Sequence, residues 1–385
     1  MTAHRVSVAP GMLRWARQRS GLGVEDLSGR FPKLADWEAG RLSPTMRQLE
    51  GYAQATHTPI GYLFLPTPPV ETLPVPDFRT FGERPVLTPT PDLLDTIYAC
   101  EQRQEWYREY AEASGVEQVA LVGSLGLDSD VVEAAGQLRD MLGFGLARRV
   151  DFPTWTAALD GLREHAEDAG VLIMTNGVVG SNTHRKLNPE EFRGFALVDS
   201  FAPLVFINGA DTKAAQIFTL AHELAHVALG GSAISRPDLG SLDETSETER
   251  WCNRVAAELL VPVSSLRQEY LAGNDIGGEL ARLAKYYKVS TLVILRRIFD
   301  AGLIDQQAYR SVYQAELGRL LALLGEGTSG GNFYNTQPVR VSKRFARALI
   351  ADTLDGRTLY RDALRLLGFK KHSTFEELGQ RLGVA

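Results

Sequence analysis

The residues that suggest chemistry most directly are His222, Glu223 and His226, in the pentapeptide His-Glu-Leu-Ala-His. On a helix, positions four residues apart share one face, so the two imidazoles can bind one tetrahedral Zn²⁺. Zinc lowers the pKa of a bound water to about 7, and Glu223 is placed to act as the general base that takes its proton. The pentapeptide alone also fits two hydrogen-bonded histidines in a helix core, so that alternative stays open.

A catalytic zinc site needs a third protein ligand, and Glu249 is the leading candidate. Asn253 follows it by four residues and is predicted to hydrogen-bond a ligand imidazole from the second coordination shell. The flanks of the histidines are apolar or small, which makes burial of unpaired imidazoles costly. Three further glutamates are rivals for the third ligand: Glu244, Glu247 and Glu258. The last of these also fits a buried structural carboxylate.

Two residues are candidates for stabilising an oxyanion or holding substrate: His184, in a predicted loop over residues 181–186, and Tyr286. The neighbouring Tyr287 is a further candidate. A surface histidine and packing tyrosines are the structural alternatives. The strand predicted at 202–208 lies just before the histidine-bearing segment, and we expect it to be a sheet edge that pairs with an extended substrate peptide.

The elements that must position these residues follow an α+β pattern, with strands first and helices after them. Short apolar runs predict strands at 170–176, 192–199 and 202–208, and helical spacing predicts helices at 213–229 and 247–261. The predicted domains are a helical domain, a proline-rich linker, the site-bearing domain and a helical, basic C-terminal domain: 1–66, 67–91, 92–302 and 303–385. Nine basic and three acidic residues give 339–371 a local charge of +6.

Composition describes an ordinary globular chain of 385 residues with 44% hydrophobic and 23% charged residues. Its net charge of −6 argues against a surface that binds nucleic acid all over. The two cysteines, Cys100 and Cys252, favour a reducing compartment over a disulfide framework. We see no apolar leader and no run long enough to span a bilayer, so we expect a cytoplasmic protein that does not bind membranes.

The segment FTLAHELAHVALG, followed by ETERWCNRVAAELLVP, resembles the ImmA/IrrE family of bacterial metallopeptidases. Cys252 and Val255 depart from the usual alanine and phenylalanine of that pattern. The resemblance implies a zincin-like core with His222, His226 and Glu249 as zinc ligands and Glu223 as base. It also implies regulatory cleavage of a partner protein, often a repressor or antitoxin in mobile-element or stress-response systems. By ligand type the metal is zinc, although two histidines and a glutamate also accept manganese or iron.

Members of this family often begin with a Cro-repressor-like helix-turn-helix domain, which residues 11–64 resemble. The segment between Leu27 and Glu38 is about one helical turn shorter than usual, and Pro32 lies near the start of its predicted second helix. Eight basic and five acidic residues give 1–66 a charge of +3. This domain therefore either binds DNA or docks a protein.

A second helix-turn-helix-like pattern lies at 276–303, within the site-bearing domain. Its apolar spacing and its Val289-Ser290 turn fit either DNA binding or packing against the metal site, and we favour packing.

Two functions follow. The first is a zinc endopeptidase that cleaves a regulatory protein; the second is a DNA-binding regulator or antitoxin with a vestigial or structural metal site. The intact set of ligands and base favours the first. The substrate, the activating signal, the oligomeric state and the role of the basic C-terminal domain are left open by the sequence.

Overall fold

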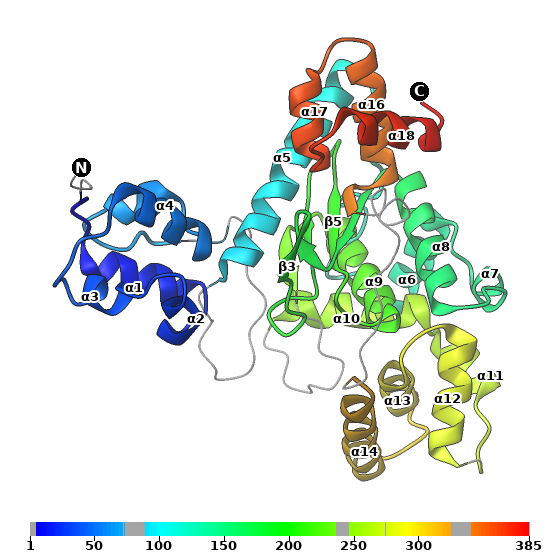
Figure 1. Ribbon diagram of the computed structural model, residues 1–385. Coiled ribbons are helices and arrows are strands. Elements are labelled where there is room, and N and C mark those ends of the chain that lie inside the picture. Colours follow the sequence, from blue (N-terminus) through cyan, green and yellow to red (C-terminus); the bar gives the residue numbers. More distant parts are fainter. Residues whose placement is uncertain are drawn as a thin grey trace. The chain divides into compact units, whose positions relative to one another are not determined.

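The computed structural model describes residues 5–71, 73, 89–235, 246–273, 275–324 and 340–384. Most of the predicted linker at 67–91, and Glu244, lie outside these ranges. The chain divides into two compact units, one of residues 1–74 and 86–97 and one holding the rest. Helices and strands are mixed, which confirms the α+β class (Figure 1). Among the described residues no helix is both long and apolar enough to cross a membrane.

The N-terminal unit is built from short helices around an aromatic core. Trp37 and Tyr52 lie edge to face with ring centroids 6.4 Å apart, and the Tyr52 hydroxyl donates to the Leu13 carbonyl. Helix α3, where the resemblance leads us to expect a recognition helix, has five residues, of which Leu34, Trp37 and Glu38 are buried. DNA binding by this unit stays a prediction. Its elements are α1 (Pro10–Arg19), α2 (Val24–Ser28), α3 (Leu34–Glu38), α4 (Met46–Ala55) and the 3₁₀ helix η1 (Ile60–Phe64).

The larger unit is organised on a four-stranded mixed sheet in the order β1-β5-β4-β6. The strands β1 and β5 are parallel, and β4 is antiparallel to both of its neighbours, β5 and β6. The expectation that the strand before the histidine helix is a sheet edge is wrong, because β5 is hydrogen-bonded on both sides. All of its residues are buried, as an inner strand covered on both faces requires. The strands are β1 (Leu172–Asn176), β4 (Gly194–Leu197), β5 (Leu204–Asn208) and β6 (Ala233–Ser235).

A separate antiparallel pair, β2 (Val178–Val179) and β3 (Asn182–Lys186), carries His184. The prediction of a loop at 181–186 is therefore wrong. This strand is almost wholly exposed and polar, so it lacks the alternation of buried and exposed residues by which a sequence indicates a strand.

Helices α8 (Trp155–Asp168) and α9 (Lys213–Leu229) pack on the sheet, and α10 (Glu247–Leu260) packs on α9 and on α6 (Val131–Leu142) (Figure 1). The predicted helix at 213–229 coincides with α9. It begins where the Thr212 hydroxyl accepts from the Ala215 amide, and it ends at Gly230, whose φ of 77° suits glycine.

The helix-turn-helix-like segment packs into the same core. Helices α12 (Ile276–Tyr287) and α13 (Thr291–Asp300) contribute buried apolar residues to it, and the Trp155 indole donates to the Val289 carbonyl between them. The packing favoured from the sequence is thus what the structure shows for this segment. The remaining helices of this part are α7 (Leu146–Val150), α11 (Val263–Glu269) and α14 (Gln306–Leu324).

The C-terminal helices gather on the long helix α5 (Pro91–Ala113). Phe345 of α16 packs edge-on against Trp106 of α5, with ring centroids 5.5 Å apart, and the Arg103 guanidinium donates to the Leu366 carbonyl. On its other side α5 reaches the sheet, because the Gln104 amide donates to the carbonyl of Leu197. These helices are α16 (Lys343–Leu354), α17 (Tyr360–Leu367) and α18 (His372–Leu382).

Candidate metal centre

Helix α9 holds His222, Glu223 and His226 in the interior, each no more than 1% exposed. Its surroundings explain this burial, since the residues between and around the motif are apolar or small and face the sheet on one side and α10 on the other. Three ionisable side chains buried on consecutive turns of one helix are costly unless each finds a charged or metal partner. The helix thus carries polar groups that packing alone does not explain.

Glu249, in the first turn of α10, completes a cluster with the two histidines. Its carboxylate oxygens lie 3.3 Å from His222 Nε2 and 2.9 Å from His226 Nε2, and the two Nε2 atoms are 3.1 Å apart. Ligands bound tetrahedrally to zinc at about 2.0–2.1 Å would lie about 3.3 Å from one another. The three donor atoms therefore converge at a spacing that fits one zinc ion, and they are the one such group found in the described part of the chain.

Burial and neighbouring groups shift the pKa values of His226 and Glu249. Burial lowers the pKa of His226, which outweighs the hydrogen bond to Glu249 and leaves the imidazole neutral at pH 7. Burial acts to raise the pKa of Glu249, but the charge and hydrogen bonds of His222 and His226 outweigh it and bring the pKa to about 2. A deprotonated carboxylate and a neutral imidazole are the forms in which Glu249 and His226 would bind a divalent cation.

Glu223 faces the sheet at the first residue of β4. A Cβ atom added to Gly194 would stand 3.1 Å from Glu223 Oε1, 3.0 Å from the Phe206 carbonyl oxygen and 2.6 Å from Thr219 Cγ2. Real Cβ atoms do not approach carbon this closely, so only glycine lets the strand lie against the carboxylate. The sequence does not single out Gly194, because its tight contacts lie 12 to 29 positions away and leave no local signal.

The other end of α10 is held by arginines. The carbonyls of Glu258, Leu259 and Val261 accept from Arg139, Arg149 and Arg297 respectively, at 3.1, 3.4 and 3.0 Å. These cations satisfy carbonyls that a helix C-terminus leaves open and complement its negative dipole end.

The rivals of Glu249 lie elsewhere or have another role. Glu258 is 5% exposed, forms an ion pair with Arg297 and accepts from the Val263 amide at 3.3 Å, so it is the structural carboxylate that the sequence allowed. Glu247 is exposed, and Glu244 lies outside the described residues. The structure therefore brings Glu249, and neither described rival, to the histidines.

The remaining candidates are not brought to the cluster. His184 is exposed on β3, and the metal-competent group does not include it. Tyr286 lies on α12 against Tyr287, with ring centroids 4.9 Å apart, and its pKa is raised by burial and by Glu269. Asn253 is half-buried, one turn along α10 from Glu249, and its predicted hydrogen bond to an imidazole stays a prediction.

A buried group of two histidines and a glutamate, on two helices packed beside a mixed sheet, is the kind of site that metallohydrolases use. Residues 166–299 match the family model described as the IrrE N-terminal-like domain, which supports a peptidase of the ImmA/IrrE family. Residues 341–381 match a second model, described only as a domain of unknown function (DUF8813). The chain matches no curated protein.

Proposed function

We propose that this protein is a zinc-dependent endopeptidase that makes a regulatory cleavage in a partner protein of the repressor or antitoxin class. The convergence of His222, His226 and Glu249 beside the buried Glu223 is the observation that carries the proposal. The match over 166–299 supports peptidase activity. The partner class rests on the family resemblance.

The proposed chemistry divides between the metal and the chain. Bound zinc would lower the pKa of a water and polarise the scissile carbonyl. Glu223 would accept a proton from the attacking water and return it to the leaving amine nitrogen. Its burial beside Gly194 fixes the carboxylate, so little reorganisation is needed when the proton moves.

An extended substrate would pair with the edge of the sheet nearest the site. Since β5 is an inner strand, this role passes to β6, which pairs with β4 on one side only among the described strands. Backbone hydrogen bonds along such an edge hold a peptide whatever its side chains, which suits cleavage of a protein segment.

Metal content of the purified protein is the test. We expect about one zinc per chain in the wild type and in Glu223→Gln, and none in His226→Ala. Of the two mutated residues, His226 is a proposed metal ligand and Glu223 is not. Glu223→Gln should retain zinc and lose cleavage by about 10²-fold or more. A wild type that takes up no zinc even when it is supplied would overturn the proposal in favour of a DNA-binding or partner-docking regulator.

A further inference from the structure

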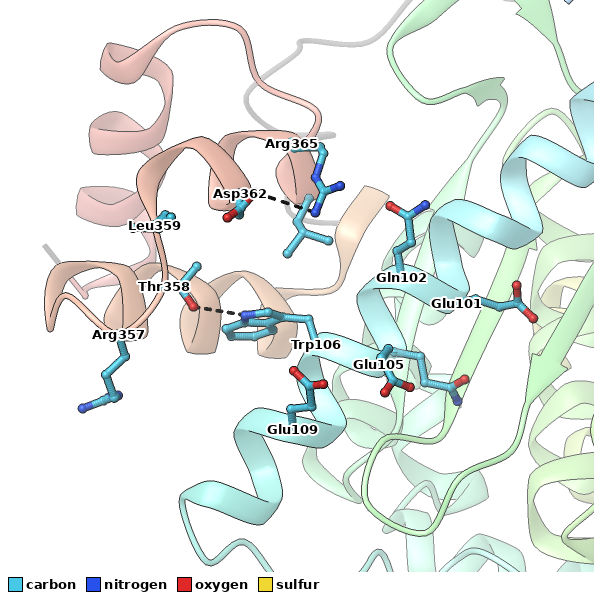
Figure 2. A pocket seen from close by; sticks show the side chains of 12 residues that line it. Glu101, Gln102, Glu105, Trp106, Glu109, Arg357, Thr358, Leu359, Asp362 and Arg365 are labelled. Atoms are coloured by element: carbon cyan, nitrogen blue, oxygen red, sulfur yellow. Dashed lines mark hydrogen bonds and ion pairs between the residues drawn. The ribbon is translucent and has the colours of Figure 1, made fainter. Parts of the chain in front are cut away.

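A groove lies between α5 and the start of α17, away from the metal cluster. It has a volume of about 800 Å³ and is walled by side chains from both helices and from the turn before α17. Figure 2 shows the side chains of α5 on one side and those of residues 357–365 on the other. One wall thus belongs to the region matched only as a domain of unknown function.

The floor of the groove is fixed by a chain of hydrogen bonds. The Trp106 indole donates to Thr358 Oγ1 at 3.1 Å (Figure 2). The Thr358 hydroxyl in turn donates to Asp352 at 2.6 Å. Asp352 also accepts from Arg357 Nε at 2.6 Å, and Tyr110 stacks on Trp106 with ring centroids 5.4 Å apart. A surface held in this way loses little freedom when it binds a ligand, so it is pre-organised for docking.

The α5 wall is a stripe of carboxylates. Glu101, Glu105 and Glu109 recur every four residues and therefore share one face of the helix. Glu101 and Glu109 form no ion pair with any other described residue. The lining holds four carboxylates and two guanidinium groups, a formal charge of −2: Glu101, Glu105, Glu109, Asp362, Arg357 and Arg365.

The facing wall offers apolar surface. Leu359 lines the groove and is 63% exposed, and Leu366 lies buried beneath it. An exposed leucine at the edge of a fixed polar groove offers an apolar contact to a partner protein.

We propose that this groove docks a basic amphipathic helix of a protein partner, with cationic side chains on the α5 stripe and an apolar side chain against Leu359. The four-residue spacing of the carboxylates matches lysines or arginines at the same spacing on a partner helix. The negative charge disfavours nucleic acid, whose phosphates it would repel. Docking here does not depend on the proposed peptidase chemistry.

The test uses the full chain and a fluorescein-labelled helical peptide with arginine at every fourth position and leucines beside them. We expect saturable binding by anisotropy that weakens with salt. The triple variant Glu101→Lys, Glu105→Lys, Glu109→Lys should bind about tenfold more weakly or worse. A matched variant with three exposed glutamates changed outside the groove, Glu117→Lys, Glu133→Lys and Glu190→Lys, should bind like the wild type.

Further variants separate docking from general charge effects and from catalysis. Leu359→Ser should weaken peptide binding several-fold, because it removes an apolar contact with the peptide. The stability of the protein should change little, because Leu359 is exposed. Glu223→Gln should bind the peptide as the wild type does. Failure of the peptidase proposal and failure of the docking proposal can therefore be told apart. Equal loss in the two triple variants would overturn the proposal. The proposal would also be overturned if the wild type self-associated without binding the peptide and the Glu101→Lys, Glu105→Lys, Glu109→Lys variant did not self-associate. The groove would then bind a second copy of the chain.

Discussion

Helix α10 carries a buried glutamate near each end, and the two have opposite surroundings. Glu249 is 7% exposed and faces two imidazoles, whereas Glu258 is 5% exposed and faces the permanent cation of Arg297. Because an arginine is always protonated, it neutralises the Glu258 carboxylate permanently, and that carboxylate has no free charge for a metal ion. Imidazoles carry no permanent charge and can themselves bind a metal. The same residue type at similar burial is therefore structural at one end of the helix and suited to a metal at the other.

The sharpest way to break this comparison is to neutralise each carboxylate in turn. Glu249→Gln should weaken zinc binding by about 10³-fold, because one of three ligands loses its charge. Glu258→Gln should leave zinc affinity within a few-fold of the wild type. Competition with a chelator of known affinity measures both, and equal losses in the two variants would show that Glu249 is no ligand.

The second prediction reverses the roles of the two glutamates. Glu258→Gln should lower the free energy of unfolding by about 3 kcal/mol, since it removes the buried counter-charge of Arg297 and leaves only the longer contact to Asp300, at 3.5 Å. Glu258→Leu combined with Arg297→Met should recover much of this loss, because it removes both charges. Denaturant unfolding of the metal-free protein measures both. A single variant as stable as the wild type would mean that the pair is not needed for folding.

A smaller effect should follow from crowding Glu223. Gly194→Ala would bring a Cβ atom to within 2.6 Å of Thr219 Cγ2, so the strand or the helix must shift. We expect about tenfold lower activity with zinc retained, because displacing the base Glu223 slows proton transfer but leaves the metal ligands in place. Adding Thr219→Ser removes the methyl group in conflict and should restore part of the activity. No effect of Gly194→Ala would show that the contact has room to relax.

The smallest effect concerns pH and the metal-free protein. The pKa values of both His226 and Glu249 are lower in the folded state than their ordinary values of 6.5 and 4.5. The unfolded chain therefore binds more protons, and stability falls as pH drops through about 6.5 and again through about 4.5. Melting temperatures from pH 7 to pH 3 should show this slope, and its lower part, below about pH 4.5, should be absent in Glu249→Gln. Zinc should be released over the same range as protons compete for the imidazoles.

The parts of this molecule that sequence predicts are those whose signals are local. His222, Glu223 and His226 lie within five residues on a helix whose cap residues are also adjacent, and the apolar runs of β1, β4 and β5 are short and clear. The pairing of strands is not local. That β5 is central depends on β1 and β4 approaching it from both sides, which its own apolar residues do not specify.

Long-range partners were equally hidden. The structural role of Glu258 rests on its ion pair with Arg297, which lies 39 residues further along the chain. The groove joins α5 to residues more than 240 positions away, as the bond from Trp106 to Thr358 shows. Neither contact leaves a periodicity or a motif in the sequence.

The arginines that hold the far end of α10 determine how much of the chain the metal site needs. Arg139 and Arg149 precede the matched region at 166–299, and Arg297 lies at its very end. A fragment cut to the matched residues would keep every donor atom of the cluster but lose two of the three cations that anchor the helix carrying Glu249. The part of the chain that holds this site therefore begins no later than α6, well before the stretch by which it is recognised.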